Sequence, residues 1–270
     1  MNMMKKTFGF VAICLLLTSC NKYDKLLNSN DYNSKYEAAM RYYNENSFSK
    51  AIQLFENLTL HYRGRDNAEE IAWYYGQSLY KEKDYYMAGY QFKRFARQFP
   101  YSERVEEGSF LSAYCKYMES PSYTLDQSLT REAIEEFEAF AERWPRSTRM
   151  PEVNRYLDEM RNKLMKKDYE LAYGYYYTEE YRAAYESLKN FINLYPEAPM
   201  RGDAMYYMLR SGYLYAIDSR EDKKQERLQQ VTADFDRVVS SIADPKQLAD
   251  AQNIYTKTRE ELAKMENKEK

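Results

Sequence analysis

Histidine is nearly absent from this chain, and cysteine, proline and glycine are scarce. The 270 residues include one histidine, three cysteines, seven prolines and eight glycines. A single imidazole leaves almost no material for a His-based metal centre or catalytic arrangement. Few turn-forming residues and little Val/Ile alternation argue against β-sheets. Abundant Glu, Lys, Arg, Ala, Leu and Met instead favour helices, so we expect an all-α chain.

Neither the charge pattern nor the known motifs indicate nucleic-acid binding or catalysis. The 40 basic and 42 acidic residues are interspersed and give a net charge of −2. No basic face for nucleic acid results. Phosphate-binding glycine loops, GxSxG, HExxH and CxxC are not found. The glutamates of "EAIEEFEAFAE" (132–142) are expected on a solvated helix face rather than in an acid/base pair. We predict no catalytic residue, no metal site and no cofactor beyond a covalent lipid discussed next.

The N-terminus has the organisation of an export signal. Two lysines at 5–6 precede an apolar stretch of about ten residues (8–17). This stretch is too short to span a bilayer, which takes about 20 residues, and fits a secretory signal peptide. It ends "LTSC" (17–20), which resembles the bacterial lipobox.

The lipobox resemblance implies removal of residues 1–19 and acylation of Cys20 with diacylglycerol and a further acyl group such as palmitate. Two or more chains anchor a protein stably, because each buried CH₂ contributes about 0.8 kcal/mol. Residues 20–34 would then form a polar tether. Asn21 follows the cysteine in place of Asp, which permits delivery to the outer membrane, and the periplasmic face is the default. The alternative is a soluble secreted protein with an incidental cysteine.

Two isolated residues are expected to be structural. With Cys14 removed and Cys20 acylated, Cys115 is the remaining thiol, so no internal disulfide is possible. It lies in a helical pattern and should be a small buried residue. His61 lies near a predicted helix end and is expected to have a structural role.

Four segments share one helical pattern: 48–63, 85–100, 130–145 and 181–196. In each, an alanine is followed four and seven residues later by a large apolar residue and eleven residues later by an aromatic one. The alanines are Ala51, Ala88, Ala133 and Ala184. Offsets of 0, 4, 7 and 11 trace one face of a helix. Proline follows in three of the four segments and ends the helix.

Each segment follows another helical pattern, so the chain is built from helix pairs. Gly76 lies twelve residues before Ala88, and Pro100 lies twelve after it. This is the layout of the tetratricopeptide repeat, which has a period of 34 residues. Here the alanines lie 37, 45 and 51 residues apart. We assign the extra length to a loop at 119–130 and to a long helix at 151–178.

The predicted fold is an all-α, right-handed superhelix of about five tetratricopeptide-like helix pairs with a C-terminal capping helix. Residues 35–146 hold repeats one to three. Residues 147–264 hold the long helix, repeats four and five and the cap, and the fifth repeat has the same offsets in 228–242. Residues 265–270 are predicted to be a disordered tail.

The first helix of each pair should line the concave face of the superhelix. The repeat register places these residues there: Tyr36, Met40, Tyr43, Trp73, Gln77, Tyr80, Phe110, Tyr114 and Tyr117 in the first three repeats, and Tyr169, Tyr173 and Tyr176 in the fourth. Tyrosine offers stiff contact area and a hydroxyl, and 30 of the 270 residues are tyrosine. A groove for an extended peptide is one interpretation. The alternative is that these rings pack between helices.

The anchor, repeat number and insertions together resemble the BamD family, lipoproteins of the outer-membrane β-barrel assembly machinery. The resemblance rests on segments 62–102 and 169–196 and covers nearly the whole chain after the signal. It implies a non-enzymatic scaffold that is lipid-anchored in the outer membrane and faces the periplasm, with no nucleic-acid partner. Its C-terminal repeats would dock on periplasmic domains of a BamA-like barrel insertase. Its N-terminal repeats would receive the C-terminal targeting strands of unfolded outer-membrane proteins.

Two other functions are compatible with a lipid anchor and helical repeats. One is a glycan-capturing lipoprotein partnered with an outer-membrane transporter. Such proteins usually carry a large extra domain, for which no stretch of this chain is long enough. The other is a periplasmic adaptor for cell-envelope synthesis.

Overall fold

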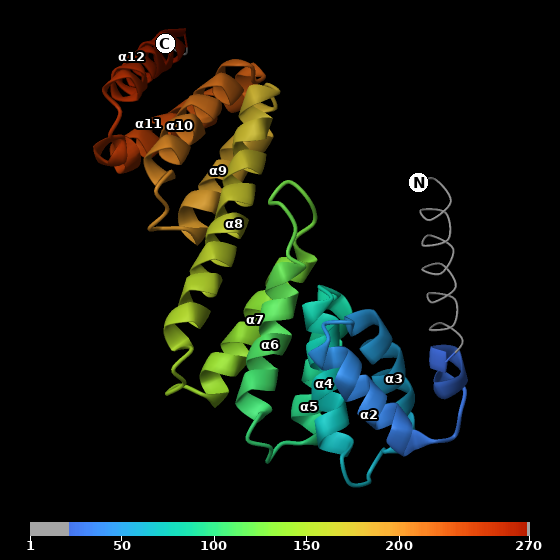
Figure 1. Cartoon of the computed structure of the whole chain (residues 1–270). Helices are drawn as coiled ribbons and strands as arrows, with labels where there is room; N and C mark the ends of the chain where they lie inside the picture. The colour runs from blue at the N-terminus through green and yellow to red at the C-terminus, as the bar shows by residue number, and fades with distance from the viewer. Residues whose placement is uncertain (1–21, 269–270) are drawn as a thin grey trace, which may run out of the picture. The chain divides into compact units, whose positions relative to one another are not determined.

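Residues 22–268, the part that the computed structural model describes, are helices and short connections (Figure 1). This range contains no strand, so the predicted all-α class is confirmed. None of the described helices is both long enough and apolar enough to span a bilayer. The predicted signal and Cys20 lie outside the described residues.

The chain divides into two units, with the boundary between Asp158 and Glu159. The helices of unit 1 are α2 (Tyr32–Asn44), α3 (Phe48–His61), α4 (Ala68–Lys81), α5 (Tyr85–Gln98), α6 (Val105–Met118), α7 (Ser128–Arg143) and the start of α8 (Met150–Tyr177). Unit 2 holds the rest of α8, α9 (Tyr181–Leu194), α10 (Arg201–Ile217), α11 (Glu221–Val238), the 3₁₀ turn η1 (Val239–Ser241) and α12 (Pro245–Lys268). The predicted long helix is therefore α8. The functional division at residue 146 stays a prediction.

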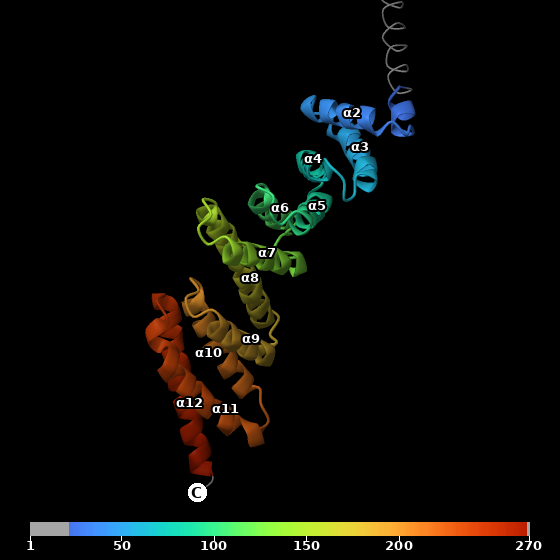
Figure 2. The same cartoon turned by 90° about the horizontal axis from the view of Figure 1, so that it is seen from below.

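Consecutive helices pack against one another in both units, as helix-pair repeats require. In unit 1 the contacts run from α2 to α3 and onward to α7, and α2 also contacts α4. Figure 2 shows the first helices of the pairs (α2, α4, α6) in one row and the second helices (α3, α5, α7) in another. In unit 2, α10 contacts α9, α11 and α12. The tetratricopeptide-like pairing is confirmed.

The repeated sequence pattern forms the core. All four repeat alanines are 0 % exposed. The large residues at offsets 4 and 7 are at most 3 % exposed: Phe55, Leu58, Phe92, Phe95, Phe137, Phe140, Leu188 and Phe191. The aromatic residue at offset 11 is the C-cap of its helix in α3, α5, α7 and α9. The side chains that define the repeat are thus the ones that remove most apolar area from water.

Both predicted flexible ends are shorter than expected. Residues 22–27, inside the predicted tether, are helical. The Tyr23 hydroxyl donates to the Lys50 carbonyl oxygen at 3.0 Å, which docks this segment on α3. At the other end α12 continues to Lys268, because Leu262 and Met265 pack against the core of unit 2. The predicted tail is wrong for these helical residues.

Substitution by alanine should have opposite effects on stability at two helical glycines, Gly76 and Gly174. A Cβ at Gly76 in α4 would lie 2.9 Å from a ring carbon of Phe92, whereas a Cβ at Gly174 in α8 would meet nothing within 4 Å. We expect Gly76→Ala to cost about 1–3 kcal/mol of unfolding free energy through overpacking. Gly174→Ala should gain about 0.5–1 kcal/mol from helix propensity. Urea denaturation measures both, and a more stable Gly76→Ala protein would contradict the close helix approach.

Candidate functional site

Four tyrosine rings from three helices of unit 1 form a row in which each ring contacts the next. We call Tyr80, Tyr114, Tyr117 and Tyr156 the aromatic row. Ring centroids lie 6.2 Å apart for Tyr80 and Tyr114, 6.0 Å for Tyr114 and Tyr117, and 4.5 Å for Tyr117 and Tyr156. The first three were predicted from sequence and are partly exposed. Tyr156, in the first turns of α8, was missed and is 6 % exposed.

The pKa is raised for three of the four tyrosines in the aromatic row. Burial raises the pKa of Tyr80 to about 12 and also raises the pKa of Tyr114. Burial raises the pKa of Tyr156 as well, and so does the hydrogen bond that its hydroxyl donates to Glu152 at 2.9 Å. The hydroxyls of Tyr80 and Tyr114, which are both partly exposed, can therefore donate and accept hydrogen bonds.

Phe110 and Trp73 were predicted to line an open groove, but both are more buried than a groove wall requires. Phe110 is 3 % exposed, because Phe137 and Phe140 of α7 close on it at 6.1 and 5.8 Å between centroids. Its assignment to an open groove wall is corrected: Phe110 is a core residue. Trp73 is partly buried and contacts the rings of Phe92 and Phe95 at 5.7 and 5.2 Å.

An arginine covers each of these two rings. The Arg104 guanidinium lies 5.5 Å from the Trp73 ring centroid, and the Arg149 guanidinium lies 4.1 Å from that of Phe110. Both arginines were missed from sequence. Each follows a helix-ending proline in a Pro-x-Ser-x-Arg sequence, at 100–104 and 145–149. The repetition of this pattern is the signal that could have found them.

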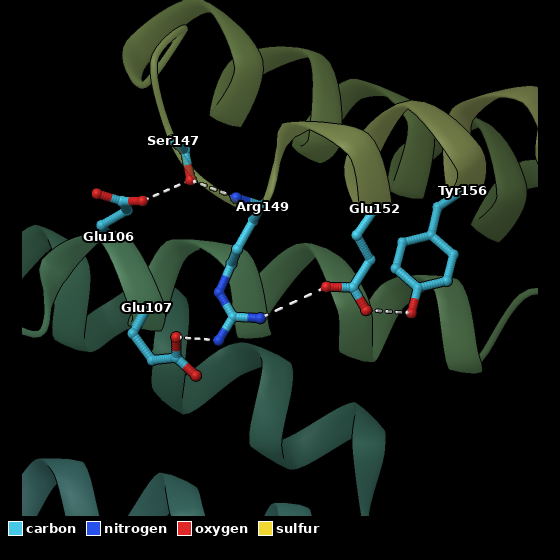
Figure 3. Close-up of polar contacts among 6 residues, drawn as sticks. All are labelled: Glu106, Glu107, Ser147, Arg149, Glu152 and Tyr156. Atoms are coloured by element: carbon cyan, nitrogen blue, oxygen red, sulfur yellow. Dashed lines mark hydrogen bonds and ion pairs between the residues drawn. The ribbon is translucent and has the colours of Figure 1, made fainter.

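The serine of each Pro-x-Ser-x-Arg sequence ties two repeats together. Ser147 Oγ donates to Glu106 at 2.5 Å and accepts the backbone N–H of Arg149 at 3.1 Å (Figure 3). Ser102 makes the same two bonds, to Glu69 at 2.6 Å and from Arg104 at 3.0 Å. The connection between helix pairs is therefore fixed to the start of the preceding first helix.

Charged contacts then orient the start of α8 beside α6. Arg149 pairs with Glu107 and, at 3.6 Å, with Glu152, which accepts the Tyr156 hydrogen bond (Figure 3). The Arg149 side chain is 32 % exposed, so each pair contributes modestly to stability. Their consequence is geometric: Tyr156 is held beside Tyr117.

The other predicted residues of unit 1 lie on α2 and α4. The Tyr43 ring lies 5.0 Å from that of Tyr74, a residue the sequence analysis missed. Burial and a hydrogen bond to Glu70 raise the pKa of Tyr36 to about 12. Gln77 and Met40 are partly buried.

Unit 2 carries a second ring cluster, built in the same way from two first helices. Tyr173 and Tyr176 of α8 lie 4.8 and 4.9 Å from Tyr207 of α10. Tyr169 stacks on Tyr173 at 6.1 Å. The three α8 tyrosines were predicted together, and Tyr207 was missed although it lies in the tyrosine pair of "AMYYM" (204–208).

Comparison with known proteins assigns the chain to a family. The model of the YfiO family, described as outer membrane lipoprotein, matches residues 28–172 and 166–268. The chain belongs to the YfiO family. The BamD family predicted from the sequence is therefore confirmed, because YfiO and BamD are two names for one family.

Solved helical-repeat structures are similar at low level to this YfiO-family chain. One is a putative kinesin light chain from Podosopora anserina with TPR-like repeats, at 15 % identity over 75 % of this chain and 93 % of that chain, with a TM-score of 0.32. Another is a tetratricopeptide repeat protein from Parabacteroides merdae, at 10 % identity over 86 % of this chain and 100 % of that one, with a TM-score of 0.34. TM-scores of this size establish neither the curvature nor the function of this chain. No curated protein matches.

In the described part of this YfiO-family chain, Cys115 and His61 both have structural surroundings. Cys115 is 0 % exposed, and burial raises its pKa to about 12. His61 stacks on Tyr32 with centroids 3.5 Å apart. Between residues 22 and 268, no group of three or more His, Cys, Asp or Glu side chains could hold a metal ion.

Proposed function

We propose that this outer membrane lipoprotein is a non-catalytic scaffold of the β-barrel assembly machinery. In this proposal Cys20 carries the lipid anchor, and the repeats face the periplasm. Unit 1 receives the C-terminal strands of unfolded outer-membrane proteins. Unit 2 docks on periplasmic domains of a BamA-like insertase. The observation that carries the proposal is the family match, which extends from residue 28 to residue 268.

The chemistry of the aromatic row supports an extended peptide as its ligand. Tyr80, Tyr114 and Tyr117 are partly exposed, and the raised pKa of Tyr80 and of Tyr114 keeps those two hydroxyls neutral. A strand that ends in an aromatic residue could add its ring to this row, and each aromatic pair is worth about 0.5–1.5 kcal/mol beyond area burial. The hydroxyls could meet peptide N–H and C=O groups that would otherwise be desolvated without partners.

Exposed apolar side chains on α8 support a docking role for unit 2. Leu171 is 58 % exposed and Tyr175 is 36 % exposed, and a spacing of four residues places them on one helix face. Tyr177, 78 % exposed, follows at the helix end. Exposed apolar surface of this kind is typical of protein contacts.

Depletion followed by complementation tests the proposal. Depleting the protein should lower many barrel proteins in the outer membrane together, as measured by quantitative mass spectrometry of outer-membrane fractions. Wild type should restore them. Tyr80→Ala with Tyr117→Ala should not, because it removes two of the three partly exposed rings. The matched control, Tyr101→Ala with Leu60→Ala, removes two large side chains that are 99 % and 77 % exposed and belong to neither proposed surface, and it should restore barrels fully.

Each outcome of this experiment has a defined meaning. If depletion left barrel-protein levels normal but abolished the uptake of one glycan, the assembly function would be rejected in favour of glycan capture. Full restoration by the Tyr80/Tyr117 variant would reject the aromatic row as the strand site. Circular dichroism of both variants should show the helix content of the wild type.

A further inference from the structure

A cluster of arginines without carboxylate partners lies along α5 and beside the end of α3. A groove of about 400 Å³ is lined by Arg63, Tyr90, Lys93, Arg94, Arg97 and Gln98, with no acidic residue among them. Lys93 pairs with Glu136. Among residues 22–268, Arg63, Arg94 and Arg97 form no ion pair. In a chain whose net charge is −2, this clustering is a local excess of positive charge.

An apolar notch adjoins the arginine groove and shares Tyr90 and Lys93 with it. The notch has a volume of about 150 Å³, and its wall includes Tyr85, Tyr86 and Tyr90, together with Leu129, Lys116 and Glu119. Cavities of about this size hold a benzene-sized ring. Tyr86 and Tyr90 are 69 % and 59 % exposed, so the notch opens to solvent between two large rings.

Glycine at position 89 accounts for the notch. The residue after the repeat alanine is Ile52, Ile134 or Tyr185 in the other three segments, but Gly89 in α5. A Cβ at Gly89 would lie 3.1 Å from the Cβ of Cys115, so the glycine lets α6 approach closely. It also leaves no side chain at this position to fill the adjacent space.

We propose that this α5 face binds a short acidic segment of a partner protein, with one apolar side chain of the segment in the notch and its carboxylates on Arg63, Arg94 and Arg97. Arginine suits this role because its planar fork pairs with carboxylates in a bidentate manner. From Tyr86 to Arg97 the helix rises roughly 17 Å, which about five residues of an extended peptide would cover. A lipid headgroup fits less well, because a flat bilayer surface would leave the notch unfilled.

The arginine groove shares no lining residue with the aromatic row, and the notch adjoins the row where the Tyr85 ring lies 5.9 Å from that of Tyr80. The α5 helix belongs to the row of second helices in unit 1, whereas Tyr80 and Tyr114 belong to α4 and α6 in the other row (Figure 2). The carboxylates of the acidic segment and the barrel-protein strand would therefore contact different residues, and neither proposal depends on the other.

Fluorescence anisotropy with the full-length protein in neutral detergent tests the proposal. The probes are a labelled acidic peptide with a central phenylalanine and the same peptide with a central glycine. We expect the phenylalanine peptide to bind about tenfold more tightly, as expected for burial of one large apolar side chain. Arg94→Glu with Arg97→Glu should weaken both peptides at least about tenfold.

Two further variants separate the notch from general charge. Lys246→Glu with Lys257→Glu makes the same charge change at two exposed residues of unit 2 and should leave both affinities unchanged. Tyr90→Ala should weaken the phenylalanine peptide about fivefold and leave the glycine peptide unchanged. Equal affinities for the two peptides, or no effect of the arginine substitutions, would overturn the proposal. So would tight binding to anionic phosphatidylglycerol vesicles with none to the peptides.

Discussion

Phe137→Ala should lower the unfolding free energy of unit 1 by about 3–5 kcal/mol, the cost of removing a buried phenylalanine and leaving a cavity. Phe137 is 0 % exposed and occupies the offset-4 position of its repeat. Its ring lies 6.1 Å from Phe110 of α6 and 5.4 Å from Tyr156 of α8. The substitution therefore removes contacts between three helices at once.

The matched control for Phe137→Ala is Glu135→Ala in the same helix. Glu135 is exposed, and its truncation should change the unfolding free energy by no more than about 0.5 kcal/mol. Urea denaturation followed by circular dichroism compares the two variants with wild type. If both lost the same stability, the repeat pattern would not define the core of unit 1. The structure also predicts that Phe137→Ala loosens Tyr156 and so disturbs the aromatic row.

The core could be predicted from sequence because its signal is periodic. An alanine and two large apolar residues, such as Ala133, Phe137 and Phe140, recur at the same offsets in four segments, and helix geometry places these offsets on one buried face. The ends of three of the four repeat helices could also be predicted, because a proline follows them and proline cannot continue a helix. The pattern needs no knowledge of how successive helix pairs are arranged.

The site was harder to predict. The repeat register shows which face of a helix a residue lies on, but it does not show how deeply the side chain is buried. Phe110 and Tyr114 share a helix face, yet Phe110 is closed by rings of α7 and Tyr114 is not. Which ring is covered depends on the next helix pair and on Arg149, which lies outside the helical pattern. Tyr156 and Tyr207 were missed for the same reason: they join their clusters across a helix boundary that periodicity within one repeat does not specify.

The high tyrosine content should make this protein unusually sensitive to alkaline pH. Burial is the first cause that raises the pKa to about 12 for Tyr23, Tyr36, Tyr75, Tyr80 and Tyr169. In the unfolded chain tyrosine loses its proton near pH 10. Between about pH 10 and 12 the folded state therefore binds more protons than the unfolded state, and the unfolding free energy falls as pH rises. Below about pH 10 these residues contribute no pH dependence.

The size of this loss can be assigned to single residues by conservative substitution. Each fully shifted tyrosine contributes at most about 1.4 kcal/mol per pH unit, and partly exposed rings contribute less. Tyr75 is 5 % exposed, so Tyr75→Phe should make the decline in unfolding free energy measurably shallower above pH 10. Tyr101→Phe, at a residue 99 % exposed, should leave the slope unchanged. Urea titrations at pH values from about 8 to 12 measure these slopes. Identical slopes for wild type and Tyr75→Phe would show that burial of this phenol does not link folding to pH.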